Sequence, residues 1–119
     1  MNYLNTGLQS GNIEILEHKN RTAVIMQGEI DCSLKDQAGA SIAIALGRYL
    51  PVIIDTSAVT FIDSTGVASL IQFCEVGAQE GVEVYLVKPP TVVTDVLEML
   101  DMINLFNCIE DEKHIQLTH

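Results

Sequence analysis

The hydrophobic period of this chain switches repeatedly between two residues and about 3.6 residues, which restricts it to few folds. The switching begins after two β-rich runs, at residues 13–18 and 22–30. Only the three residues KNR, 19–21, separate these runs, which is short enough for a hairpin loop. The first two strands are therefore predicted to pair antiparallel.

A helical period starts at Ser33, which is predicted to be the N-cap of the first helix. Pro51 closes this helix. The apolar face of the helix comprises Leu34, Ala38, Ile42, Ala45, Leu46 and Tyr49. The run VIID at 52–55 follows, and its continuous apolar character is typical of a buried central strand.

A second helix is predicted from near Thr65 to a glycine stop at Gly81. Its apolar stripe comprises Val67, Leu70, Ile71, Cys74 and Ala78. A strand is predicted at 82–87, and the sequence PPT at 89–91 ends it. A third helix follows, with its stripe at Val93, Val96, Leu97 and Leu100.

The end of the chain carries weaker patterns. LFNCI at 105–109 is predicted as a short last strand, and the polar tail at 111–119 as a frayed helix or coil. The 119 residues suit one domain, with its core at about 12–110. The expected fold is α/β, with a mixed sheet of about four or five strands and helices packed on it.

Strand–helix–strand crossovers place successive strands parallel, so the second, third and fourth strands should end at one edge of the sheet. That edge would collect Asp31 and Cys32, a predicted loop at 55–66, and Lys88 to Pro90. Sites in open α/β sheets are usually built at this carboxyl edge.

The amino-acid composition limits the kinds of partner that this protein is expected to bind. Six lysines and arginines against sixteen acidic residues give a formal net charge of −10, which disfavours nucleic acid and anionic membranes. No apolar run is long enough to span a membrane, and the N-terminus lacks a secretory pattern. The three cysteines, Cys32, Cys74 and Cys108, show no metal-ligand spacing and suggest reduced thiols in a cytoplasm. No cofactor is expected, and other proteins are the expected partners.

The most informative stretch is FIDSTGVASL, 61–70, on the predicted carboxyl edge. Asp63 or Ser64 could cap the second helix, and this reading needs nothing further. Gly66 is then unexplained, because glycine in a first turn costs about 1 kcal/mol relative to alanine. Something that approaches the backbone closely, such as a partner, would explain it.

A catalytic nucleophile is a second reading of this stretch. It requires a base, and only His18, His114 and His119 are available. None of them is clearly placed on the carboxyl edge, and the G-x-S-x-G elbow is absent. The chain is therefore not expected to be an enzyme.

A phosphate acceptor is the third reading. Ser64 in an exposed turn could reach a kinase, and its phosphate would face the positive end of the following helix. Asp63 could orient the hydroxyl. Residue spacing alone makes this reading plausible and leaves the helix cap open.

FIDSTGVASL resembles the motif of STAS domains, specifically of the anti-sigma factor antagonists of bacteria. GEID at 28–31 resembles the second strand of that family, and VYLVKPP followed by TDVLEMLDMINLF resembles its fourth strand and third helix. The likeness extends from about residue 12 to residue 110.

The resemblance implies that Ser64 is phosphorylated, with Asp63 beside it and Asp31 nearby at the end of the second strand. Thr65 and Gly66 complete the turn. It also implies a partner that is both anti-sigma factor and Ser/Thr kinase, which releases its sigma factor when this protein binds, and a phosphatase that reverses the modification. The alternative is a STAS binding subunit of a lipid-transport or stress-signalling assembly with no sigma factor.

Overall fold

The computed structural model describes residues 11–111. Its five-stranded sheet has the order β1-β2-β3-β4-β5, antiparallel between the first two strands and parallel thereafter. The predicted α/β fold with an N-terminal hairpin is thus confirmed. The elements are β1 Asn12–Glu17, β2 Thr22–Ile30, the 3-10 turn η1 Cys32–Leu34, α1 Lys35–Leu46, β3 Val52–Ile62, α2 Ser64–Glu80, β4 Val84–Val87, α3 Thr91–Met99, the 3-10 turn η2 Ile103–Leu105 and β5 Asn107–Ile109.

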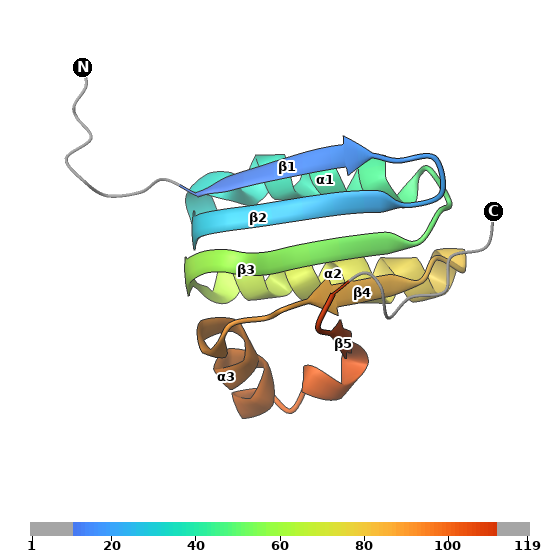
Figure 1. Cartoon of the computed structure of the whole chain (residues 1–119). Coiled ribbons are helices and arrows are strands. Elements are labelled where there is room, and N and C mark those ends of the chain that lie inside the picture. The colour runs from blue at the N-terminus through green and yellow to red at the C-terminus, as the bar shows by residue number, and fades with distance from the viewer. Residues whose placement is uncertain (1–10, 112–119) are drawn as a thin grey trace, which may run out of the picture.

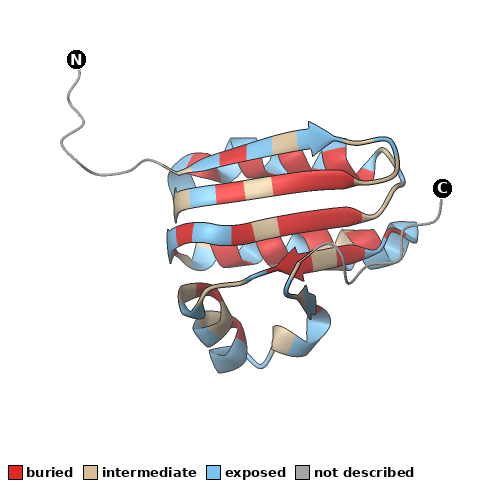
Figure 2. Cartoon of the chain, viewed as in Figure 1, coloured by how far each residue is buried: buried red, intermediate tan, exposed pale blue. Residues whose placement is uncertain are grey.

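The helices α1 and α2 lie on the same face of the sheet, with α1 behind β1 and β2 and α2 behind β3 and β4 (Figure 1). The buried residues gather toward the starts of β2 and β3 and on the helix sides that face the sheet (Figure 2). Phe73 and Leu70 of α2 and Met26 of β2 are among the fully buried members of this core. Burial of apolar surface contributes about 20–33 cal/mol per Å² and stabilises the packing of the helices on the sheet.

The strand β3 is much longer than the predicted run 52–55. It continues to Ile62, so most of the segment 55–66, which was predicted to be a loop, is sheet. The reason is its neighbour: β2 is nine residues long and stays paired with β3 up to Ile30 opposite Ile62, through two register shifts. Because β3 is paired along this length, its backbone N–H and C=O groups form hydrogen bonds within the sheet.

The start and end of α1 also differ from the prediction. Ser33 is not the N-cap, because Asp31 caps η1 by accepting a hydrogen bond from the Ser33 N–H, and α1 begins only at Lys35. The helix ends at Leu46, and Tyr49, which was predicted on the buried face, is 64% exposed with a φ of 56°. The chain turns there before it can bury that ring.

The remaining elements follow the prediction with small shifts. Gly81 ends α2 at a φ of 74°, a conformation that glycine adopts without strain. β4 begins at Val84 instead of residue 82, and the predicted last strand is confirmed as β5. Residues 112–119 of the tail lie outside the described part of the chain. Within residues 11–111, no helix combines the length and the apolar character that crossing a membrane requires.

Candidate functional site

The carboxyl ends of β2 and β3 meet at one edge of the sheet. Ile30 and Ile62 are register partners at these ends, and each is followed directly by an aspartate, Asp31 or Asp63. The Asp63 N–H donates a 3.2 Å hydrogen bond to the Ile30 carbonyl and continues the sheet by one bond. Parallel pairing therefore brings together two loops that are far apart in sequence; Cys32 and Asp63 are separated by 31 positions.

Asp63 is the N-cap of α2, and it also joins the two loops. Its Oδ1 accepts a 3.0 Å hydrogen bond from the Gly66 N–H, and its Oδ2 accepts a 3.2 Å bond from the Cys32 N–H. The helix cap is the interpretation of this stretch that rests on local sequence alone. Caps of this type stabilise a helix by about 0.5–2 kcal/mol. The second bond, to Cys32, is a tertiary contact.

Ser64 is exposed and is the first residue of α2. Among the described residues, its hydroxyl has no hydrogen-bond partner, and the N–H groups of Ser64 and Thr65 have no acceptor. Free N–H groups and the helix dipole favour an anion at such a position. The turn thus presents a hydroxyl to solvent beside donors that could stabilise a phosphate.

The neighbouring serines differ from Ser64 because their hydroxyls are already bonded. Ser33 donates to Asp31 at 2.6 Å, Ser57 donates to Asp55 at 2.6 Å, and Ser69 donates to the Thr65 carbonyl at 3.1 Å. Ser69 is also buried. Ser64 is therefore the serine of this edge whose hydroxyl is both exposed and available.

Ser64 and Thr65 lie on different sides of α2. Thr65 is partly buried and lines a groove of about 510 Å³ between α1 and α2, together with Lys35 and Gly39. Ser64 lines another groove, of about 400 Å³, between α2 and α3. Adjacent residues on a helix are about 100° apart, so the sequence DSTG does not place both hydroxyls on one surface.

Asp31 is partly buried at the end of β2, and its Oδ1 accepts hydrogen bonds from the Ser33 hydroxyl and the Ser33 N–H. These bonds hold the pKa of Asp31 below its usual value, so it stays ionised at neutral pH. Among the described residues no hydrogen bond joins Asp31 to Ser64. The two loops are connected instead by the bond from Cys32 to Asp63.

Gly66 is buried, and the structure supplies an internal reason for it. A Cβ at this position would lie 2.6 Å from both the Ile30 carbonyl oxygen and the Ile62 Cγ1. The group that approaches the Gly66 backbone closely is therefore the end of β2. No partner is needed to explain it.

Gly66→Ala is expected to lower the free energy of unfolding by about 1–3 kcal/mol, because the added methyl group overpacks the contact between α2 and β2. Gly39→Ala on α1 is the matched control. A Cβ there meets nothing within 4 Å, so alanine should stabilise the exposed helix by up to about 1 kcal/mol. Urea denaturation of both variants measures the difference, and equal effects would contradict the packing argument.

The cysteine thiols do not form part of this site. Burial raises the pKa of Cys74 to about 11, and burial also raises the pKa of Cys108. Both are therefore protonated and weakly nucleophilic at neutral pH. Cys32 is exposed at the carboxyl edge, where its backbone N–H is the group that contacts Asp63.

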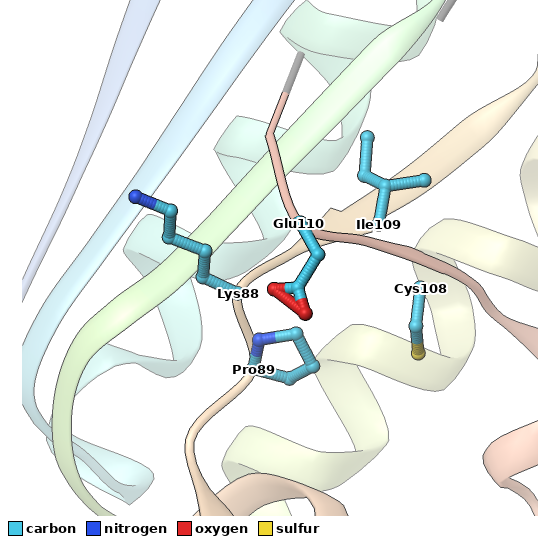
Figure 3. A pocket seen from close by; sticks show the side chains of 5 residues that line it. All are labelled: Lys88, Pro89, Cys108, Ile109 and Glu110. Carbon is cyan, nitrogen blue, oxygen red and sulfur yellow. The ribbon is translucent and has the colours of Figure 1, made fainter. Parts of the chain in front are cut away.

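A small pocket of about 240 Å³ lies at the carboxyl ends of β4 and β5, beside the predicted edge residues Lys88 to Pro90. Figure 3 shows the Lys88 amino group pointing away from Cys108 and Glu110. The Lys88 N–H donates to the Ile109 carbonyl at 2.9 Å, which holds the two strand ends together. This pocket contains no converging set of polar groups.

Among the described residues, no histidine lies near Ser64 to act as a general base for catalysis. His18 lies in the hairpin turn before β2, at the opposite end of the strand from Asp31, and His114 and His119 lie outside the described residues. In the described range 11–111, no three potential metal ligands cluster.

Sequence reasoning missed the groove between α2 and α3. Val96 and Leu100 were predicted as part of the apolar stripe of the third helix, and both line this groove, although Val96 also packs against the core. Val93 and Leu97, from the same stripe, are fully buried. The sequence did indicate this groove, because the apolar stripe of the third helix is too wide to be covered by the sheet alone.

Comparison with known proteins supports the fold described above. The family model described as STAS domain matches residues 12–116, whereas no curated protein matched the chain. Among solved structures, an anti-sigma factor antagonist from Mycobacterium paratuberculosis is 21% identical with a TM-score of 0.76, covering 88% of this chain and 90% of its own.

The anti-sigma factor antagonist SpoIIAA in its unphosphorylated form is 17% identical with a TM-score of 0.72, covering 87% of this chain and 92% of its own. The phosphorylated form of SpoIIAA from Bacillus is 19% identical with a TM-score of 0.66, covering 87% and 96%. At these identities the structures show a shared fold. The family model spans the whole sheet and the β3–α2 turn with its Asp-Ser-Thr-Gly sequence, so this chain belongs to the STAS-domain family.

Proposed function

We propose that this protein is an anti-sigma factor antagonist that is switched off by phosphorylation of Ser64. The observation that carries the proposal is the state of Ser64: exposed, without a hydrogen-bond partner among the described residues, and at the N-terminus of α2. A kinase needs an accessible hydroxyl, and the helix end can accept the anion that phosphorylation creates.

The turn around Ser64 is preorganised for recognition. Asp63 is held by two hydrogen bonds through its side chain, and Gly66 allows α2 to approach β2 closely. Asp31 lies beside this turn, and Thr65 belongs to the turn but faces the other side of α2. Both residues are proposed to contact the partner. A rigid epitope loses less entropy on binding than a mobile loop does.

The proposed partner is an anti-sigma factor that is also a Ser/Thr kinase, and a phosphoserine phosphatase restores the active form. The protein itself acts by binding, in the cytoplasm where sigma factors work. The likeness to the anti-sigma factor antagonist from Mycobacterium paratuberculosis and to both forms of SpoIIAA supports this proposal.

The test is a release experiment with a candidate anti-sigma kinase encoded near this protein and its fluorescently labelled sigma factor. Adding the unmodified protein should lower the anisotropy of the sigma factor as the complex dissociates. A variant in which Asp63 and Ser64 are both replaced by lysine is the control for nonspecific competition. If the protein binds no such kinase and releases no sigma factor, it is instead a STAS binding subunit of another assembly.

A further inference from the structure

The groove between α2 and α3 is an apolar surface that the fold leaves open. It has a volume of about 400 Å³, in the size range of ligand pockets. Asp63 and Ser64 lie at one end of it. Its apolar lining comprises Ile62, Val67, Ala68, Ile71, Val96, Leu100 and Met102.

Only part of this surface stays exposed, because several of its lining residues belong to the core or pack against it. Val93 and Leu97 already anchor α3 against the rest of the domain and are fully buried. Leu100 in the lining is 50% exposed, and its neighbour Met99, which does not line the groove, is 84% exposed. Large apolar side chains concentrated at one exposed place are typical of an interaction site.

The charges around the groove are of one sign. Asp63 is the charged residue in its lining, and none of the lysines and arginines within residues 11–111 lines it. On α3, Asp95 is four residues before Met99, so the two share one side of the helix beside Val96 and Leu100. An occupant must therefore combine apolar contacts with positive charge.

We propose that this groove docks an amphipathic helix with an apolar face and basic flanks, supplied by the protein partner. The inference rests on the proposed function and names the contact through which that partner binds. Apolar anchors at i, i+3, i+4 and i+7 of such a helix match a groove between two helices. Lysines and arginines on its flanks would meet the acidic rim, and its end nearest Ser64 would bring the partner over the acceptor hydroxyl.

The experiment uses an 18-residue synthetic helix with leucines at i, i+3, i+4 and i+7 and lysines on both flanks. Its matched control carries glutamate in place of every lysine. In NMR titrations of the whole protein, the basic peptide should shift the signals of Val67, Ile71 and Val96. The acidic peptide should leave these signals unchanged.

Two leucine variants test the position of the contact. Leu100→Ser removes an anchor of the groove, and Leu105→Ser removes an equally exposed leucine in η2 that does not line it; each is 50% exposed. Leu100→Ser should raise the Kd of the basic peptide about tenfold or more, as expected for the loss of one buried leucine side chain. Leu105→Ser should change binding less than twofold.

Other outcomes overturn the inference. Equal binding of the basic and acidic peptides would exclude charge recognition, and equal losses in the two leucine variants would exclude this groove. Shifts of the groove signals by decanoate but not by the basic peptide would assign the groove to an acyl chain instead.

Failure of the proposed function is a separate result. If no kinase phosphorylates the protein while the basic peptide binds as expected, the switch is wrong and the groove assignment remains. If Ser64 is phosphorylated, Leu100→Ser should raise the KM for the kinase about tenfold at unchanged kcat. An unchanged KM would show that the kinase does not use this groove.

Discussion

Ser64→Ala is expected to abolish phosphate incorporation by the cognate kinase. Ser64 is the exposed serine of the carboxyl edge whose hydroxyl is not bonded within the described residues, whereas Ser33, Ser57 and Ser69 donate to internal acceptors. A bonded or buried hydroxyl would have to break a local contact before reaching a kinase, and Ser64 has none to break.

The measurement is incorporation of labelled phosphate from ATP, with the modified residue mapped by mass spectrometry. Thr60→Ala is the matched control, because Thr60 is an exposed hydroxyl four residues earlier, on β3. It should incorporate phosphate like the wild type. Ser64→Ala should change the free energy of unfolding by no more than about 0.5 kcal/mol, as for other exposed positions. Substantial labelling of Ser64→Ala would move the acceptor to another residue.

Phosphorylation of Ser64 is expected to weaken partner binding by orders of magnitude while leaving the domain folded. The phosphate adds about −1.5 to −2 charges beside Asp63, in a chain of net charge −10. The free N–H groups at the start of α2 favour an anion by about 0.3–1 kcal/mol, and repulsion from more distant charges is screened over about 8–10 Å. These local effects oppose each other and are similar in size, so the thermal midpoint should move by only a few degrees.

Binding is affected much more strongly because a partner that covers Ser64 must bury the phosphate. An unpaired buried charge costs several kcal/mol, which corresponds to orders of magnitude in Kd. Scanning calorimetry and a binding titration, each on the unmodified and the phosphorylated protein, separate the two effects. A collapsed thermal midpoint would indicate that the switch acts by unfolding, and an unchanged Kd would show that Ser64 lies outside the interface.

Local sequence was sufficient for the order of the elements and for the position of the turn that carries Ser64. The change from a two-residue to a 3.6-residue period predicts the hairpin, the alternating strands and helices, and hence the parallel edge at which Asp31 and Asp63 meet. The Asp63 cap is equally local, since its acceptor and the Gly66 N–H are three residues apart. The features determined by the sequence itself are thus those whose partners lie within a few residues.

Tertiary structure decided the features whose partners are far away in the chain. The length of β3 depends on its pairing with β2, and the need for glycine at position 66 depends on the Ile30 carbonyl. The apolar stripe of α3 likewise divides into a buried half and a half that lines the groove beside Ser64 only once α2 is in place. A periodicity reports which side of an element is apolar, but which neighbour covers that side, and how much of it remains open, is set by packing between elements.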